Sequence, residues 1–196
     1  MSVIIDTSCA NLTSLKFALE RLSPEVIISD DPATIMSADR VFLPGVGSAG
    51  YAMDVLKQKG LDSVIQQLTQ PVLGICLGMQ MLTSRSTEGD IACLDLIPGQ
   101  VSGLESQGLR LPHMGWNTLS ALDDHPLFQG ITEADYFYFV HSYGAQVTDS
   151  TIAQCEYGGS FSAALTHKNF MGVQFHPERS GPVGSQLLKN FLEIQI

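Results

Sequence analysis

One cysteine of the sequence stands between two glycines, in the run Gly74-Ile75-Cys76-Leu77-Gly78. The aliphatic residues Val72 to Ile75 are typical of a short strand buried on both faces, and Met79 to Ser84 predicts a helix. A cysteine at such a strand-to-helix turn is lifted above the strand ends, and the positive end of the helix favours its thiolate form. Cys76 is therefore a candidate nucleophile. The alternative is a small buried cysteine that only packs.

A histidine and a carboxylate follow another predicted strand, Phe170 to Phe175, as His176-Pro177-Glu178. A cysteine nucleophile needs an imidazole to take its proton and return it to the leaving group, and that imidazole needs an acceptor that fixes its tautomer. Because both turns follow strands, we expect Cys76, His176 and Glu178 to interact in series. A surface turn with a solvated glutamate is the alternative reading of these three residues.

The third candidate is the turn Pro44-Gly45-Val46-Gly47, which follows the predicted strand Arg40 to Leu43. Attack of a thiolate on a carbonyl builds negative charge on oxygen, and backbone N–H groups commonly stabilise it. Gly45 and Gly47 would let the peptide around Val46 turn inward, and the N–H of Leu77 would be the second donor. An ordinary Gly-rich turn or a phosphate loop is the alternative, but the Gly-Lys-Ser/Thr ending of a P-loop is missing from this turn.

The elements that must position these turns alternate between strand and helix in the first half of the chain. Val3 to Ile5 predicts a strand, and Leu12, Leu15, Leu19 and Leu22 recur at helical spacing behind the possible N-cap Asn11. The further expected elements are strands at Glu25 to Ser29, Val101 to Leu104, Tyr136 to His141, Ile152 to Glu156 and Ser162 to Thr166, and helices at Ala52 to Leu68 and Val183 to Glu193.

This order predicts an α/β fold with an open, mainly parallel central sheet flanked by helices, and with extra antiparallel strands in the second half. The turns at Gly45, Cys76 and His176 would then share the carboxyl edge of the sheet, where open α/β sheets place their sites. The combination predicts a catalytic site more strongly than any one turn does.

Composition limits the classes of protein that remain. With 196 residues we expect one domain, 1–196, and a formal net charge of −10 disfavours nucleic acid as a partner. No apolar run reaches the length of a membrane helix and the N-terminus lacks a signal-peptide pattern, so we expect a cytoplasmic protein without a membrane partner. The cysteines form no CxxC pair and the histidines are dispersed, so we expect neither a metal site nor a cofactor. The remaining cysteines are expected to be packing groups: Cys9, Cys93 and Cys155.

Two motifs resemble those of the class I (triad) glutamine amidotransferases, and the Pro44 to Gly47 turn supports the match: Gly-Ile-Cys-Leu-Gly-Met-Gln at 74–80 and Gly-Val-Gln-Phe-His-Pro-Glu at 172–178. The resemblance implies that the chain hydrolyses L-glutamine to glutamate and ammonia through a Cys76 thioester. His176 would act as general base and then acid, with Glu178 orienting it. The oxyanion loop would correspond to Gly45, Val46 and Gly47, together with Leu77.

Further stretches narrow the resemblance to members that deliver ammonia to a (β/α)₈-barrel cyclase subunit in a biosynthetic heterodimer: residues 4–12, 112–117 and 138–143, and Arg179-Ser180-Gly181. This likeness covers essentially the whole chain. It implies that the ends of glutamine are held by Gln80, His141, Ser142 and Tyr143, and that the cyclase is contacted by Met114, Trp116 and Asn117. It also implies that partner binding activates the glutaminase.

Ser8 departs from the family pattern, because glycine is common at its place in the turn after the first strand. If that turn needs a positive φ, serine would cost about 1 kcal/mol there. Two other functions remain open: a non-catalytic binding or chaperone-like protein of the related cysteine-elbow folds, and a glutaminase that serves another synthase, such as that of anthranilate or pyridoxal phosphate.

Overall fold

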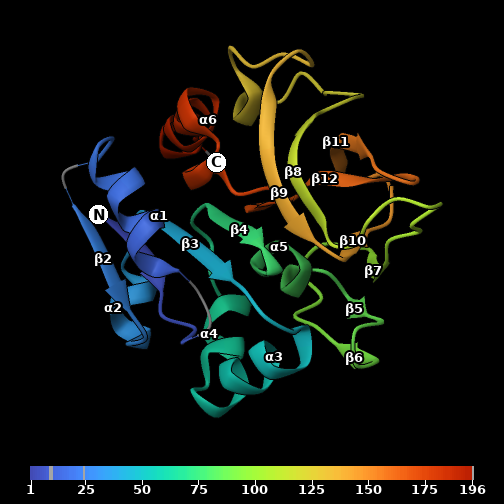
Figure 1. The fold of residues 1–196 in the computed structure, drawn as a ribbon. Coiled ribbons are helices and arrows are strands. Elements are labelled where there is room, and N and C mark those ends of the chain that lie inside the picture. The colour runs from blue at the N-terminus through green and yellow to red at the C-terminus, as the bar shows by residue number, and fades with distance from the viewer. Residues whose placement is uncertain (9–10, 24, 196) are drawn as a thin grey trace.

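The fold is an α/β arrangement around one large sheet, seen in a computed structural model that describes residues 1–8, 11–23 and 25–195 (Figure 1). The first half alternates strand and helix, as predicted. Its elements are β1 (Ser2–Ile5), α1 (Leu12–Glu20), β2 (Val26–Ser29), α2 (Pro32–Met36), β3 (Arg40–Gly45), α3 (Ala49–Gln58), α4 (Leu61–Gln66), β4 (Val72–Cys76) and α5 (Leu77–Leu82).

The second half is richer in strands, also as predicted. Its elements are β5 (Arg85–Ser86), β6 (Ile91–Ala92), β7 (Gln100–Gly103), β8 (His113–Thr118), the 3₁₀ helix η1 (Pro126–Phe128), β9 (Tyr136–His141), β10 (Tyr143–Ala145), β11 (Thr151–Glu156), β12 (Ser160–His167), β13 (Phe170–Val173), the 3₁₀ helix η2 (Pro177–Arg179) and α6 (Gly181–Glu193).

The large sheet has the order β2-β1-β3-β4-β13-β12-β10-β7-β5-β6, with β11 paired to β12. The strands from β2 to β13 in this order are mutually parallel, whereas β12 and β10 run antiparallel to their neighbours. The prediction of a mainly parallel central sheet with antiparallel additions in the second half is therefore confirmed. Because β3, β4 and β13 are adjacent and parallel, their carboxyl ends meet at one edge of the sheet.

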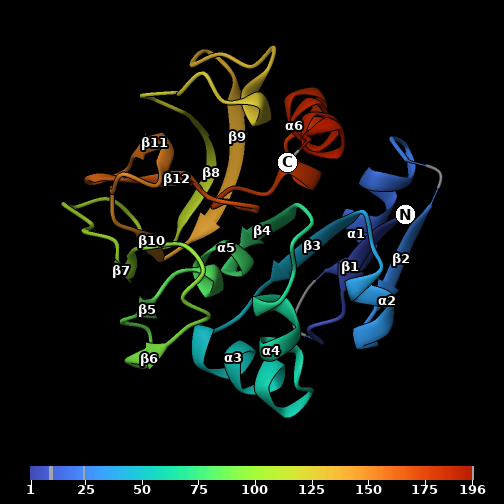
Figure 2. The same cartoon turned by 180° about the vertical axis from the view of Figure 1, so that it is seen from behind.

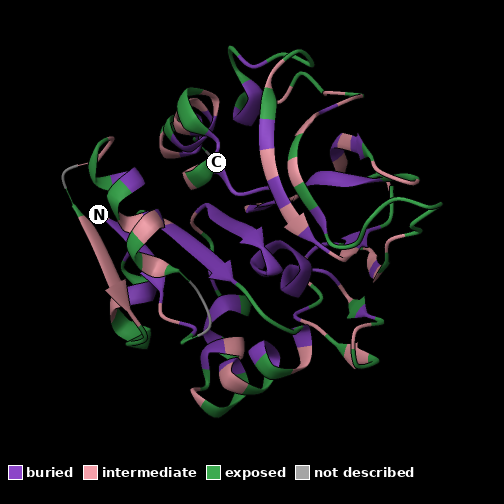
Figure 3. Ribbon diagram, in the orientation of Figure 1, coloured by how far each residue is buried: buried purple, intermediate pink, exposed green. Residues whose placement is uncertain are grey.

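Helices cover both faces of the parallel strands. Successive strand side chains point to opposite faces, so Ile4 packs with α1 and α6 while Val3 and Ile5 pack with α2, α3 and α4. Figures 1 and 2 show α1 and α6 on one side of the sheet and α3 and α4 on the other. The central strands β3 and β4 are buried except at Arg40, the half-buried first residue of β3 (Figure 3).

Some predicted elements differ from those in the structure. The helix expected at 52–68 is two helices, α3 and α4, because Gly60 adopts a left-handed conformation (φ 67°) that ends the first. Helix α2 was not predicted, although Asp31 caps it by accepting from the Thr34 N–H and Pro32 stands at its start. The predicted cap of α1 is confirmed, since the Asn11 side chain accepts from the Ser14 N–H.

Strands β8 and β9 form a separate antiparallel pair beside the large sheet. β8 was not predicted. In this pair, opposite residues such as Trp116 and Tyr138 share the outer face, and His113 and His141 share the inner face. The outer face is exposed, with 63% of Met114 and 56% of Trp116 accessible to solvent.

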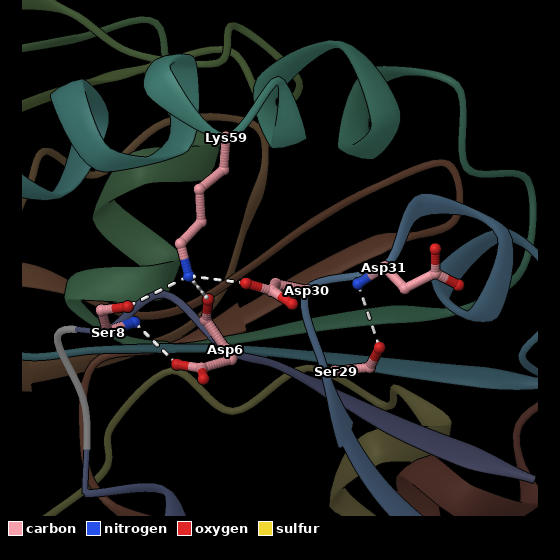
Figure 4. A network of polar contacts seen from close by, with 6 residues as sticks. All are labelled: Asp6, Ser8, Ser29, Asp30, Asp31 and Lys59. Atoms are coloured by element: carbon pink, nitrogen blue, oxygen red, sulfur yellow. Dashed lines mark hydrogen bonds and ion pairs between the residues drawn. The ribbon is translucent and has the colours of Figure 1, made fainter.

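Ser8 has a positive φ of 55°. This is the condition under which the sequence analysis expected serine to be costly in this turn. Its N–H donates to the Asp6 carboxylate (2.8 Å). The Lys59 ammonium holds the turn by donating to Ser8 Oγ (3.0 Å), to the Asp6 carbonyl (3.1 Å) and to Asp30 (2.9 Å), as Figure 4 shows. Hydrogen bonding to Lys59 lowers the pKa of Asp30. The turn at the end of β1 is thus tied to the end of β2.

Cys155 is buried, as predicted, and Cys93 is half-buried, while Cys9 lies outside the described residues. Within the described ranges, no helix combines the length and the apolar character needed to cross a membrane.

Candidate active site

Cys76 ends β4 and stands immediately before α5, at the predicted turn. Its backbone has φ 53°, a conformation that L-residues rarely adopt, so the turn is strained as expected of a nucleophile elbow. Both flanking glycines are sterically required. A Cβ on Gly78 would lie 1.7 Å from the Leu43 carbonyl oxygen, and one on Gly74 would lie 2.8 Å from the backbone of Gly78. The two glycines therefore let α5 pack directly over β3 and β4.

His176 reaches the same edge because β13 pairs in parallel with β4, with Val173 opposite Ile75. Beyond the strand, the His176 N–H donates to the Tyr138 carbonyl (2.9 Å), which ties this segment to β9. The His176 Nδ1 and Glu178 Oε1 atoms are 2.8 Å apart, and the two side chains are only 8% and 7% exposed. Glu178 thus fixes the tautomer of the ring, and Nε2 is left for another partner.

The environment of His176 favours its charged form. Burial by itself would lower the pKa of His176, but the neighbouring Cys76 and Glu178 side chains, which favour the charged ring, outweigh burial and raise that pKa well above its ordinary value of 6.5. Among the described residues, Nε2 of His176 makes no aligned hydrogen bond, a looseness that is common at catalytic sites without substrate. The structure thus brings His176 and Glu178 together as a close pair and places His176 just beyond β13, the strand beside the one that ends at Cys76.

A cavity of about 440 Å³ opens over Cys76. Although Cys76 is only 7% exposed, it lines this cavity, so a small molecule can reach the turn. The volume falls within the usual range for small-molecule sites. The cavity is lined by Val46, Gly47, Cys76, Leu77, Gln80, Glu88, Pro112, Val140, His141, Ser142, Tyr143 and His176.

Most of the predicted oxyanion residues lie on the wall of this cavity. Val46, Gly47 and Leu77 line it, and Gly47 has the positive φ, 94°, that its turn requires. Gly45 lies one residue behind, at the end of β3, where it packs on the Gly78 backbone and lines a smaller cavity of about 100 Å³ instead. The turn after β3 and the start of α5 thus both border the cavity that Cys76 lines.

The residues predicted to hold glutamine line the same cavity, but two of their side chains are already engaged. Gln80 Nε2 donates to the Tyr143 carbonyl and to Gln174 Oε1, both at 2.8 Å. The His141 Nδ1 is 2.8 Å from the Tyr143 carbonyl. Burial, with smaller contributions from its neighbours, lowers the pKa of His141 to about 3, so its ring is neutral. The Ser142 carbonyl is engaged as well, since it accepts from the Leu104 N–H (2.9 Å), and Gln80 Oε1 is left as an acceptor among the described residues of this wall.

Glu88 is a cavity residue that the sequence analysis missed. Its carboxylate accepts from the Ala49 N–H (2.8 Å) at the start of α3, and the side chain also lines the cavity. It adds a carboxylate to the same cavity that the predicted substrate-binding residues line. Glu88 lies in a short irregular segment without periodicity, so no sequence signal distinguishes it from a surface glutamate.

The three residues predicted to contact a partner do not share one face. Met114 and Trp116 point outward from β8, whereas Asn117 Nδ2 donates to the Glu156 carbonyl (3.0 Å) and lies 3.4 Å from His113 Nε2. The inner position of Asn117 follows from the alternation of side chains along a strand. Across the described ranges, no group of three or more His, Cys, Asp or Glu residues is arranged to hold a metal ion.

Comparison with known proteins matches residues 3–194 to the family described as glutamine amidotransferase class-I. The chain belongs to this family. This glutamine amidotransferase is 57% identical to "Imidazole glycerol phosphate synthase subunit HisH" of Shewanella sediminis, over 98% of this chain and 90% of that protein. It is 56% identical to the protein of the same name from Idiomarina loihiensis, over 99% and 98%.

Solved structures show the same fold. This glutamine amidotransferase matches a crystal structure of a glutamine amidotransferase from Thermotoga maritima with a TM-score of 0.68 and 17% identity, over 98% of this chain and 96% of that one. Another glutamine amidotransferase structure matches with a TM-score of 0.75 and 16% identity, over 97% of both chains. The predicted family is confirmed, and membership in an enzyme family argues against the non-catalytic binding protein.

Proposed function

We propose that the protein is the glutaminase subunit of an imidazole glycerol phosphate synthase. It hydrolyses L-glutamine to glutamate and ammonia, and the ammonia passes to a (β/α)₈-barrel cyclase that makes imidazole glycerol phosphate and AICAR in histidine biosynthesis. The observation that carries the proposal is that Cys76 and His176, the latter paired with Glu178, line one open cavity. Relatives more than 50% identical over nearly the full chain support the choice of synthase.

The proposed reaction starts with transfer of the Cys76 proton to His176. The thiolate attacks the side-chain amide carbon of glutamine, and the resulting oxyanion accepts hydrogen bonds from the backbone N–H groups of Gly47 and Leu77. His176 then returns the proton to the leaving nitrogen, which departs as ammonia and leaves a Cys76 thioester. Water, deprotonated by His176, attacks the thioester and releases glutamate. Glu178 holds the ring and stabilises its charged form.

Charge distribution in the cavity supports a single orientation of glutamine. Glu88 and Gln80 Oε1 offer acceptors for the α-ammonium group. The carbonyls of Ser142 and Tyr143 already accept hydrogen bonds, so the N–H groups of these two cavity residues are the donors for the α-carboxylate. In this arrangement His141 contributes through its backbone and through the support of Tyr143, because its neutral ring already contacts that carbonyl.

The outer face of β8 and β9 is the proposed contact with the cyclase. Exposed Met114 and Trp116 are of the type that anchors protein interfaces. Val140 belongs to the same face and also lines the cavity, so a partner seated there would lie beside the site that releases ammonia. Asn117 would support this face from behind, through its bond to Glu156. We further propose that residues 1–196 act as one domain.

Replacement of Cys76 by alanine tests the proposal in the assembled synthase. We expect Cys76→Ala to abolish glutamine-dependent synthesis of imidazole glycerol phosphate while ammonia-dependent synthesis continues, because only the supply of ammonia is lost. Loss of both activities would assign Cys76 a structural role. We also expect glutamate release to rise when the cyclase with its nucleotide is added, since coupling would populate the active oxyanion conformation. Equal turnover with and without the partner would remove this activation.

Thiol labelling tests the nucleophile independently. Burial raises the pKa of Cys93 to about 11 and that of Cys155 to about 12, so both stay protonated at neutral pH. A thiol-directed glutamine analogue should therefore label Cys76 before these two, as read by peptide mass spectrometry. Equal labelling of the thiols would count against a glutamine site at Cys76.

A further inference from the structure

Gln174 is a buried amide that the proposed reaction does not use. It directly follows β13 and precedes His176 by two positions. Its exposed fraction is 0%. Gln174 Nε2 lies 3.7 Å from the Cys76 sulfur, and its Oε1 accepts from Gln80 Nε2 at 2.8 Å. The amide therefore contacts the nucleophile and a cavity residue at once.

The direction of this amide is determined by its neighbours. The Tyr143 carbonyl can only accept, so the Gln80 atom 2.8 Å from it must be the nitrogen. That NH₂ group also donates to Gln174, so the Gln174 atom facing Gln80 must be the oxygen. The NH₂ group of Gln174 is thereby directed to the Cys76 sulfur.

The Tyr143 carbonyl also determines the hydrogen-bond directions in a second chain of buried groups. His141 Nδ1 must donate to Tyr143, which leaves Nε2 as an acceptor for His113 Nδ1 at 3.1 Å. His113 Nε2 then faces Asn117 Nδ2, 3.4 Å away. Burial lowers the pKa of both histidines, to about 3 for His141 and about 4 for His113, which keeps both rings neutral and this polarity intact. Inversion of the Gln174 amide alone would place its NH₂ group against that of Gln80, and inversion of both amides would place Gln80 Oε1 against the Tyr143 carbonyl oxygen.

We propose that Gln174 is a positioning residue for Cys76, whose amide donates to the sulfur, favours the thiolate and holds it toward the cavity. A hydrogen bond to the charged form of a group stabilises that form, and a bond to a charged acceptor is stronger than a neutral one. The amide does not titrate, so this donor is present at every pH, unlike that of His176. The hydrogen bond from Gln174 also favours one of the staggered χ1 rotamers of Cys76. The proposal rests on Cys76 being the nucleophile.

The pH dependence of Cys76 alkylation tests this role in the purified chain. Gln174→Met keeps the size of the side chain but removes the donor. We expect the midpoint of Cys76 carbamidomethylation by iodoacetamide to move upward by about one pH unit, because the thiolate loses a hydrogen bond. The matched control is Asn190→Leu, since Asn190 is also a buried amide but donates to the Leu127 and Gln129 carbonyls, outside the cavity. An unmoved midpoint in Gln174→Met, or an equal shift in Asn190→Leu, would overturn the proposal.

Kinetics in the assembled synthase give a second measurement. We expect Gln174→Met to lower kcat for glutamine about tenfold with a smaller change in KM, since the amide contacts the nucleophile while Gln80 keeps its bond to the Tyr143 carbonyl. A rise in KM with unchanged kcat would assign Gln174 to substrate binding and contradict the proposal.

A third measurement needs no variant and applies if Gln174→Met does not fold. In the ¹⁵N-labelled native chain, the side-chain NH₂ resonances of Gln174 should shift when Cys76 is alkylated, whereas those of Asn190 should not. Unmoved Gln174 resonances would overturn the proposal. The proposed function fails by a different result, namely glutamine-dependent synthesis that survives Cys76→Ala.

Discussion

His176 depends on two neighbours, and Glu178 is the one that can be neutralised without touching the nucleophile. Glu178→Gln keeps the shape of the side chain but removes the charge that favours the imidazolium form. With burial still acting in the opposite direction, we expect the pKa of His176 to fall, and glutaminase kcat in the complex to fall at least about 10²-fold. The ring resonances of His176, followed by NMR against pH, measure this shift.

An internal reference is present in the same titration. Burial lowers the pKa of His125, and this ring accepts from the Leu127 N–H away from the cavity. Its titration should be identical in the native chain and in Glu178→Gln. If both histidines moved together, the change would reflect altered folding and not the charge of Glu178.

Ser8 has a backbone conformation that glycine adopts more easily, and its hydroxyl contacts Lys59. Ser8→Gly and Ser8→Ala both remove this contact, but only alanine keeps a Cβ at φ 55°. We expect Ser8→Gly to unfold with a free energy about 1 kcal/mol higher than Ser8→Ala, measured by denaturant titration. Equal stabilities would show that the turn relaxes when the hydroxyl is lost.

At the scale of elements, the elbow depends on the close packing of α5 against β3. Gly78→Ala would place a Cβ 1.7 Å from the Leu43 carbonyl oxygen, which no side-chain rotation can relieve. We expect the variant to lose at least about 3 kcal/mol of stability, or not to fold. Gly50→Ala is the control, because apart from the neighbouring backbone of α3 itself no described heavy atom lies within 4 Å of the added carbon, and α3 should gain stability or keep it. Similar losses in both variants would contradict this account of the elbow.

The outer face of β8 and β9 is a second element with a testable role. Trp116 is 56% exposed, so Trp116→Ala should leave the melting temperature nearly unchanged. Its affinity for the cyclase, measured by calorimetry, should fall about tenfold or more if this tryptophan anchors the interface. Tyr51→Ala on α3 is the control, since that side chain is 62% exposed on another element. Equal effects on affinity in both variants would reject β8 and β9 as the contact.

At the scale of the whole molecule, the neutral pair His113 and His141 makes folding sensitive to acid. Burial lowers the pKa of both below the value of 6.5 that they regain on unfolding. Between about pH 4 and 6.5 the unfolded chain therefore binds more protons, so stability is complete above 6.5 and falls as the pH drops. The slope approaches about 1.4 kcal/mol per pH unit for each histidine.

Denaturant titrations between pH 4.5 and 7.5 measure this sensitivity. We expect His113→Gln to be less stable at pH 7.5, because packing against Tyr157 and Phe139 is lost, but to have a shallower pH dependence. An unchanged slope would show that His113 is not neutral in the folded chain. His176 has the opposite sign: its raised pKa contributes stability that is complete below 6.5 and is lost as the pH rises through the folded value.

Much of the site was predictable because its parts depend on short-range rules. The glycines around Cys76, the buried run before it and the spacing of His176 and Glu178 each encode a local geometry. Parallel strand ends must then lie at one edge of the sheet, so three turns far apart in the sequence could be expected together. The exact bounds of the helices were harder to predict from the sequence. A single left-handed residue, Gly60, divides a segment whose periodicity predicts one helix.

Long-range packing decided the rest. The direction of the Gln174 amide follows from a carbonyl on β10 and an amide on α5, and Glu88 joins the cavity through the start of α3, so neither has a local signature. The inward position of Asn117 depends on β8, a strand stabilised by its pairing with β9 rather than by its own composition. The local sequence thus specified the candidate nucleophile and its partners. The buried hydrogen bonds that orient them form only when distant segments pack together and exclude the water that would otherwise compete for these polar groups.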